Sequence, residues 1–192
     1  MGTILGVVLA GGASRRMGSD KLSLELAGEP LWRRQTRVLR AAGAERVLLV
    51  RRPDQPLPAG GWGGRDVYAN SGPLAGLQAA LIGAVEPWAA VLAVDMPGIG
   101  PDWFNWLRGF CRPGSGAIVR QPGGFEPLAA IYPREALAEA TARLQRRELA
   151  LQRLVANLAE SGRLSVVPVP AAWSGRTANL NTPAEFVRWS VV

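Results

Sequence analysis

Short apolar runs alternate with helix-length segments along the whole chain, and this alternation limits the possible folds more than any other feature. The apolar runs predict strands at residues 4–10, 46–50, 66–69, 89–94, 116–121 and 164–169. Helical patterns separate them, at residues 30–42, 73–85, 101–110, 133–146 and 149–159. This order is typical of βαβ units. We therefore expect an α/β fold, a single-domain Rossmann-like three-layer sandwich with a mostly parallel sheet and helices on both faces.

The composition excludes several kinds of chemistry. The 192 residues fit one domain, and they include no histidine and a single cysteine, Cys111. A Ser-His-Asp triad, a Cys-His dyad and a zinc site rich in His or Cys are thereby excluded. Cys111 follows a predicted helix and is expected to pack in the core. The net charge of +7 favours an anionic partner such as a nucleotide, a phosphorylated cofactor or a nucleic acid, but a solvated surface rich in Arg explains it equally well.

The chain shows no feature typical of a membrane protein. Its first apolar run has no basic region before it and stops at Ala10, so it is interpreted as a strand and not as a signal peptide. No stretch of about 20 apolar residues follows. We expect a cytoplasmic protein with neither a membrane nor a nucleic acid as its partner.

A glycine-rich, basic segment directly follows the first predicted strand. Residues 9–21 read Leu-Ala-Gly-Gly-Ala-Ser-Arg-Arg-Met-Gly-Ser-Asp-Lys. Backbone N–H groups of such a loop form a concavity that binds anions, and Gly11 and Gly12 allow close approach. Arg15, Arg16 and Lys21 add positive charge, so the segment predicts a polyphosphate site. The spacing matches neither the Walker loop nor the dinucleotide-binding fingerprint.

Three further patches are candidates for the same site. Asp95 follows an apolar strand, where a lone Asp is often a turn former but beside phosphates is a typical Mg²⁺ ligand. Residues 178–185 contain Asn179 and Asn181 before a good helix start, in which Thr182 and Glu185 form a capping box. Residues 71–77 open a helix with two glycines, a pattern that suits either anion binding or plain packing.

Two loops carry weaker signals. Residues 53–65 are rich in Pro and Gly and predict a mobile loop over the site. Trp62 and Trp173 lie in predicted loops and are candidates for stacking on a flat ring, whereas the other tryptophans lie in or beside helices and are expected to pack.

Residues 9–21 resemble the signature Leu-Ala-Gly-Gly-x-Ser-x-Arg-Met-Gly-x-Asp-Lys of the nucleotidyltransferases that make the dinucleotide form of the molybdenum cofactor. The Gly-Pro-Leu-Ala-Gly segment, the strand-end Asp and the Asn-x-Asn-Thr-Pro segment follow in the same order as in that family. The chain is thus similar to the molybdenum cofactor guanylyltransferase family, which has a nucleotide-diphospho-sugar transferase fold. Leu-Ala-Gly-Gly is similar to the guanylyl-transferring branch, whereas Leu-Ala-Ala-Gly marks cytidylyl-transferring relatives.

The resemblance implies a role for each matching residue. Asp95 would bind Mg²⁺ and the nucleotide, and Arg16, Lys21 and Asn181 would complete the catalytic set. The nucleotide-binding residues would come from the glycine-rich segment and from the start of the helix after the third strand, namely Leu9, Ala10, Gly11, Gly12, Lys21, Asn70, Gly72, Pro73, Leu74 and Asp95. The whole chain, 1–192, would be one nucleotidyltransferase domain.

The implied reaction is transfer of GMP from GTP to the terminal phosphate of the molybdenum cofactor (molybdopterin), with release of pyrophosphate. An attacking phosphate monoester is ionised at neutral pH, so the reaction needs no general base. Contact with proteins that handle the molybdenum cofactor is a further expectation. Arg120, Glu126 and Pro127 lie where the acceptor side of the family would approach.

Two departures concern selectivity for the base. Many members of the family have Asn at the end of the second strand and Asp at the end of the third, where this chain has Val50 and Asn70. Three alternatives therefore stay open: cytidylyl transfer to the molybdenum cofactor, nucleotidyl transfer to a sugar phosphate, and a non-catalytic protein that binds nucleotides or nucleic acid.

Overall fold

The computed structural model describes residues 2–11, 22, 24–65, 71–180, 185 and 189. In this part of the chain one eight-stranded sheet has the order β10-β7-β9-β6-β1-β4-β5, with β8 paired to β7. Its strands are β1 (Ile4–Leu9), β4 (Arg46–Arg51), β5 (Gly63–Arg65), β6 (Trp88–Ala93), β7 (Gly116–Gln121), β8 (Gly124–Phe125), β9 (Ala129–Pro133) and β10 (Leu164–Pro168). A separate hairpin consists of β2 (Glu25–Leu26) and β3 (Glu29–Pro30).

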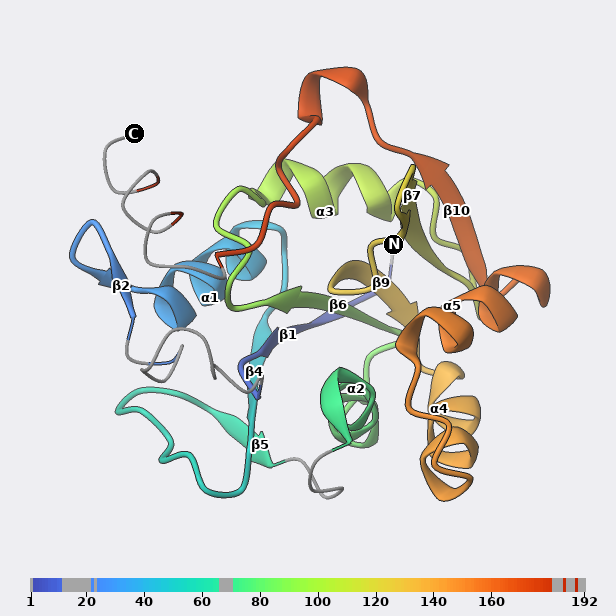
Figure 1. Ribbon diagram of the computed structural model, residues 1–192, viewed down its shortest axis with the longest axis horizontal. Coiled ribbons are helices and arrows are strands. Elements are labelled where there is room, and N and C mark those ends of the chain that lie inside the picture. Colours follow the sequence, from blue (N-terminus) through green and yellow to red (C-terminus); the bar gives the residue numbers. More distant parts are fainter. Residues whose placement is uncertain are drawn as a thin grey trace.

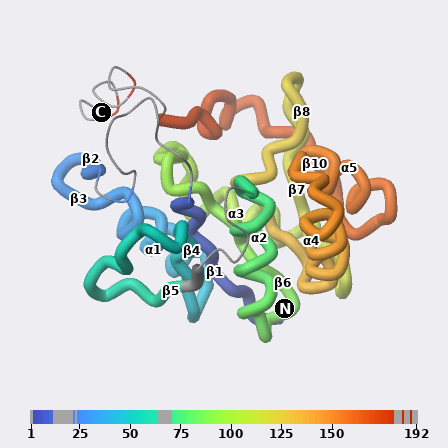
Figure 2. The backbone as a smooth tube through the Cα atoms, turned by 60° about the horizontal axis from the view of Figure 1, so that its bottom comes forward, coloured from blue at the N-terminus to red at the C-terminus, as the bar shows by residue number. Residues whose placement is uncertain are grey.

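Helices cover both faces of the sheet. They are α1 (Leu31–Ala41), α2 (Gly72–Ile82), α3 (Pro101–Arg108), α4 (Ala136–Gln145) and α5 (Leu151–Glu160), and η2 (Ala171–Trp173) is a short 3₁₀ turn. In Figure 1, α1 and α3 lie above β1 and β6, and α2 and α4 lie below. Figure 2 shows α2 and α4 side by side on their face, where they are in contact. The expected three-layer α/β sandwich is confirmed.

The middle of the sheet is parallel and fully buried. β1 pairs in parallel with β4 on one side and β6 on the other, so that Leu9 lies opposite Val50 and Ala93. Every residue of β1 and β6 is buried, as expected for strands with a helix layer on each face. Alternate residues serve the two cores: Val8 packs on the α1 face, and Leu9 packs against α2.

The longest strand that the sequence analysis missed is β9. β9 runs antiparallel between β6 and β7, and the predicted helix at 133–146 begins only at Ala136. The prediction was wrong because Pro133, a favourable first residue for a helix, ends a strand instead. The run Ala129–Tyr132 has only one β-branched residue and gave no strand signal. β9 packs so closely on β7 that a Cβ at Gly116 would collide with the carbonyl oxygen of Ile131.

The segment 53–65 was predicted to be a mobile loop, but its last three residues form a strand. Gly63–Arg65 form β5, which pairs in parallel with β4. The strand predicted at 66–69 lies outside the described residues. Among the helices that are described, none is long and apolar enough to span a bilayer.

Candidate active site

The carboxyl ends of β1, β4 and β6 meet at one rim of the sheet. The Val94 N–H donates to the Leu9 carbonyl at 3.0 Å, and the Ala10 N–H donates to the Val50 carbonyl at 2.8 Å. The chain passes from β1 to β4 on one side and later returns to β6 on the other. Ligands of open α/β sheets bind outside the carboxyl ends of the strands at such a reversal. The predicted phosphate loop and the predicted metal ligand therefore begin on neighbouring strands.

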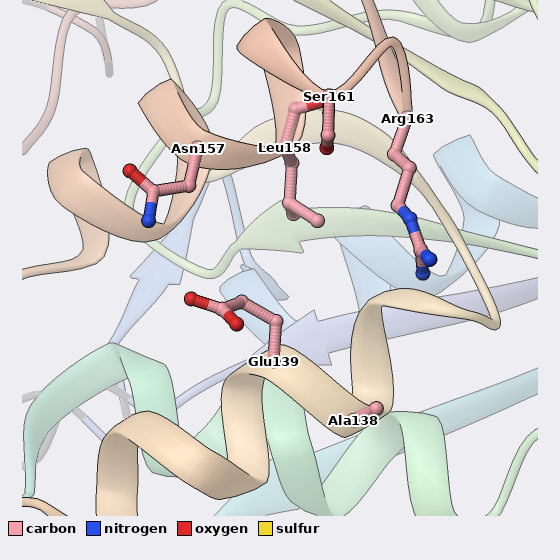
Figure 3. A pocket seen from close by; sticks show the side chains of 6 residues that line it. All are labelled: Ala138, Glu139, Asn157, Leu158, Ser161 and Arg163. Carbon is pink, nitrogen blue, oxygen red and sulfur yellow. The ribbon is translucent and has the colours of Figure 1, made fainter.

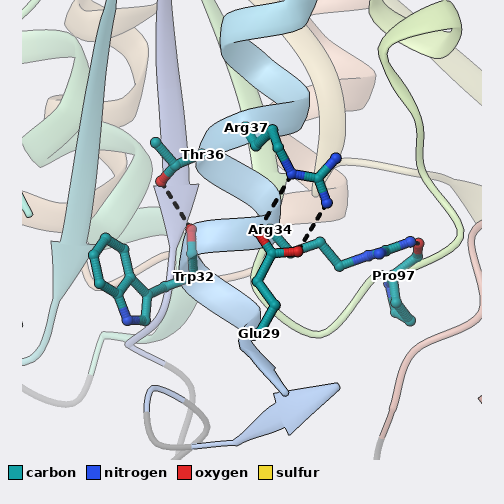
Figure 4. Close-up of polar contacts among 6 residues, drawn as sticks. All are labelled: Glu29, Trp32, Arg34, Thr36, Arg37 and Pro97. Atoms are coloured by element: carbon teal, nitrogen blue, oxygen red, sulfur yellow. Dashed lines mark hydrogen bonds and ion pairs between the residues drawn. The ribbon is translucent and has the colours of Figure 1, made fainter. Parts of the chain in front are cut away.

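Asp95 lies in a turn that α1 holds from one side. The Gln35 side chain is fully buried, and its Nε2 donates to the carbonyls of Met96 at 2.9 Å and of Ala93 at 3.3 Å. The Arg34 Nη2 donates to the Pro97 carbonyl at 3.3 Å, and Figure 4 shows this side chain reaching from α1 to Pro97. Two successive residues of one helix thus fix the position of the backbone on both sides of Asp95.

The carboxyl-terminal segment reaches the same turn. The Leu180 N–H donates to the carbonyl of Asp95 at 2.8 Å, although 85 positions separate the two residues, and the Leu180 side chain is buried. This contact brings the segment that ends at Leu180 to the strand-end Asp. Asn181 itself lies outside the described residues.

The structure places part of the predicted set at this rim and leaves the rest untested. Described members are Leu9, Ala10, Gly11, Gly72, Pro73, Leu74 and Asp95. Those outside the described residues are Gly12, Arg16, Lys21, Asn70 and Asn181. Leu74 is fully buried, so its side chain belongs to the core beneath α2.

The described glycines differ in what they do. A Cβ on Gly76 would lie 3.1 Å from the Leu9 side chain, so this glycine allows α2 to pack closely on β1. Gly72 has a φ of +65°, a backbone conformation that favours glycine at the start of α2. Among the described residues, the nearest atom to a Cβ built on Gly11 is the Arg52 Cγ, at 3.6 Å, an ordinary van der Waals distance.

Gln55 joins the two strands where their ladder ends. Its Oε1 accepts from the Arg52 N–H at 2.8 Å, and its Nε2 donates to the Ala10 carbonyl at 3.4 Å. The side-chain amide thus makes the two hydrogen bonds that a backbone peptide group would make between β1 and β4. The side chain is almost completely buried, and it fixes the start of the 53–65 loop beside the rim.

A second carboxyl group lies near Asp95. Burial raises the pKa of Glu126 above its usual range, and the nearby negative charge of Asp95 raises it further, whereas a hydrogen bond from the Leu128 N–H opposes both effects. The Glu126 N–H donates to the Val119 carbonyl, which anchors this residue between β7 and β9. Glu126 is thus a second carboxyl group in the neighbourhood of Asp95.

Three residues outside the predicted set, Trp173, Trp62 and Cys111, make contacts within the fold. Trp173 packs against Trp103 and Trp106, with ring centroids 5.7 and 5.2 Å away, so it belongs to an aromatic cluster. Trp62 is half-exposed, with the Arg46 guanidinium 4.7 Å from its ring centroid. Burial raises the pKa of the Cys111 thiol to about 12, in agreement with a packing role.

A cavity of about 410 Å³ lies elsewhere, between α4 and α5. Figure 3 shows Glu139 facing Asn157 and Leu158 across it, with Ser161 and Arg163 at the end of α5. None of the predicted site residues lines it, and it lies away from the carboxyl ends of the central strands.

Comparisons with known proteins agree with this geometry. Residues 6–164 match the model of a MobA-like NTP transferase domain. The chain belongs to that family. It is 52% identical over 186 residues to a probable molybdenum cofactor guanylyltransferase of Opitutus terrae, across 95% of this chain and 92% of the relative. A relative of the same name from Deinococcus radiodurans is 34% identical, across 95% and 92% of the two chains.

A solved structure shows the same fold. The molybdopterin-guanine dinucleotide biosynthesis protein A of Archaeoglobus fulgidus aligns with a TM-score of 0.73 and 23% identity, over 97% of each chain. Members of the MobA-like family are nucleotidyltransferases, so this chain is an enzyme of that class.

Sequence reasoning missed the residues that hold the rim in place. Gln35 occupies a buried position of a helix otherwise packed by Leu31, Val38 and Leu39. A polar residue in the apolar stripe of a helix is a readable signal. Gln55 gave no signal, because its role depends on a loop that returns to β1.

Proposed function

We propose that this enzyme transfers GMP from GTP to the terminal phosphate of the molybdenum cofactor and releases pyrophosphate. The observation that carries the proposal is the convergence on Asp95, where β1, β6 and the carboxyl-terminal segment are joined by backbone hydrogen bonds. Similarity to guanylyltransferases over nearly the whole chain supports the choice of substrates.

The donor set at the rim fits a divalent cation. Asp95 is partly exposed, its backbone is fixed by Gln35 and Leu180, and Glu126 adds a second carboxyl group nearby. Mg²⁺ held there by Asp95 would neutralise charge on the phosphate oxygens of the nucleotide. Magnesium dependence is part of the proposal.

The residues of the chain bind and align the two substrates. A phosphate oxygen of the acceptor forms a bond to the α-phosphorus of GTP, while the bond to the β-phosphate oxygen breaks and pyrophosphate leaves with the electron pair. The nucleophile is already ionised, so a protein without histidine needs no proton acceptor for this step. Lys21 and Arg16, with N–H groups of Gly11 and Gly12, would stabilise the negative charge that is transferred.

Release of pyrophosphate tests the proposal. The purified protein is mixed with Mg²⁺, molybdopterin and one of GTP, CTP or ATP, and the dinucleotide product is identified by mass. Of the three nucleotides, we expect only GTP to give the dinucleotide product. Equal or faster reaction with CTP would contradict guanylyl transfer. Tight binding without turnover would favour a nucleotide sensor, and binding to DNA or RNA with a steep salt dependence would favour a nucleic-acid-binding protein.

A further inference from the structure

A buried arginine at the rim has no place in the site described so far. Arg51 is the last residue of β4, one position beyond Val50, which pairs with the last residue of β1. Its side chain is only 5% exposed. Within the described part of the chain, no acceptor lies within hydrogen-bond distance of its Nε and Nη1 atoms. Buried N–H donors without acceptors are costly, which indicates that a ligand supplies acceptors for these two atoms.

Arg51 lies next to Gly11, at the start of the predicted phosphate loop. A Cβ on Gly11 would be 3.9 Å from the carbonyl carbon of Arg51. By strand alternation Arg51 shares the face of Val47 and Leu49, which pack with Ala10 in the core beneath α1. The guanidinium therefore belongs to the same rim as Ala10 and Gly11.

The order of the strands gives the nucleotide a direction. Asp95 follows β6 and Arg51 ends β4, and the two strands flank β1 on opposite sides. Two strand spacings, about 10 Å, separate them. A nucleotide that has its phosphates at Asp95 and extends across the end of β1 brings its base to the end of β4.

We infer that Arg51 determines the choice of base by donating hydrogen bonds to O6 and N7 of guanine. On the edge that carries O6 and N7, guanine presents two acceptors, which match the planar fork of a guanidinium. Adenine presents one acceptor and one amino donor there, and an arginine faces that donor unfavourably. The inference rests on the proposed guanylyl transfer and assigns its selectivity to Arg51, the residue that follows Val50.

The adjacent residue provides a matched control. Arg52 is also a cation at this end of β4, but its Nε donates to Asp54 at 3.0 Å and its side chain is about one-third exposed. An Arg52→Met variant removes the same charge one residue away without removing the buried donors.

Calorimetric titration with nucleotide and Mg²⁺ tests the inference on the wild type, Arg51→Met and Arg52→Met. The ligands are GTP, ATP and a GTP analogue with carbon in place of N7. We expect Arg51→Met to weaken GTP binding by roughly 5- to 150-fold and not to weaken ATP binding, because the unfavourable contact with the adenine amino group is removed. The analogue should bind the wild type more weakly than GTP does, and this difference should disappear in Arg51→Met. Arg52→Met should retain the preference.

Equal loss of GTP and ATP affinity in Arg51→Met would show a phosphate contact and overturn the inference. An unchanged preference for GTP would also overturn it. Since buried donors without acceptors are removed, Arg51→Met is expected to fold, and circular dichroism checks this. If it does not fold, Arg51→Gln takes its place, because a side-chain amide matches the acceptor and donor of adenine and the same loss of preference for guanine is expected. Failure of the wild type to prefer GTP would instead contradict the proposed function.

Discussion

Two regions of the protein bury an arginine to the same extent and use it differently. In the corner between α4 and α5, Arg143 is 5% exposed, and its Nε and Nη1 donate to Glu139 at 2.9 Å and to Glu148 at 3.3 Å. At the rim, Arg51 is equally buried, and its Nε and Nη1 have no partner among the described residues. At the corner the protein itself supplies acceptors for the Nε and Nη1 of the arginine, whereas at the rim the described residues supply none for these two atoms. We conclude that partner atoms, more than burial, separate an arginine that stabilises the fold from one that awaits a ligand.

This contrast predicts that substitutions at the rim reduce function and those at the corner reduce stability. The largest effect is expected for Asp95→Ala. Removal of a group that holds the transferring phosphates typically costs a factor of about 100 to 1,000 in turnover. The melting temperature should change little, because the turn is fixed by backbone contacts and Gln35. Near-normal pyrophosphate release by this variant would refute the role of Asp95.

The corner should respond in the opposite way. Arg143→Met removes the ion pair of Glu139 and leaves Glu148 paired with Arg146, and both carboxylates are exposed enough to be solvated. We expect a loss of about 2 kcal/mol in the free energy of unfolding, measured by urea titration, with kcat/KM for GTP unchanged. A loss of turnover at unchanged stability would break the contrast.

Gln35→Leu tests the link between α1 and the Asp95 turn. The variant leaves the carbonyls of Ala93 and Met96 without this donor and should lose about 1–2 kcal/mol of stability. Because the turn carries the proposed metal ligand, kcat should fall more than the affinity for GTP. Thr36→Ala on the same helix, which removes a hydroxyl bonded to the Trp32 carbonyl, is a control that should leave kcat unchanged. Equal kinetics of the wild type and Gln35→Leu would exclude a positioning role.

The smallest effect concerns pH. The pKa of Glu126 is raised in the folded protein, chiefly by burial and then by Asp95, so the folded state binds this proton more tightly than the unfolded chain does. Stability is therefore lost as pH rises from below the ordinary value of 4.5 through the raised pKa. Glu126→Gln removes this loss and should melt at a higher temperature than the wild type at pH 7, with a smaller difference at pH 4. The reverse order would contradict the burial of this carboxyl group.

Local patterns predicted the parallel part of the fold well. β7 has the predicted bounds, and β1, β4, β6 and β10 differ from prediction by one residue at one end or at both. The apolar runs of β1, β4 and β6 are continuous because both faces of these strands are covered. β9 escaped prediction because Ala129 and Ala130 carry no strand preference and their burial depends on β7, a partner that local sequence does not reveal.

The site was predictable where a motif marked it and not where long-range contacts made it. Asp95 was predicted as a site residue from its place after a strand, and the structure brings Leu180 into contact with it. Arg51 was passed over because β4 was expected to end at Val50. Its burial, and the lack of acceptors for its Nε and Nη1 among the described residues, are properties of the folded chain, which alternation alone does not show.

A crystal structure with GTP and Mg²⁺ tests the central claim most directly. We predict a cation about 2.0–2.1 Å from a carboxylate oxygen of Asp95, bound to phosphate oxygens of a nucleotide that lies across the end of β1. A nucleotide bound elsewhere, or an Asp95 carboxylate beyond coordination distance of the cation, would contradict the account.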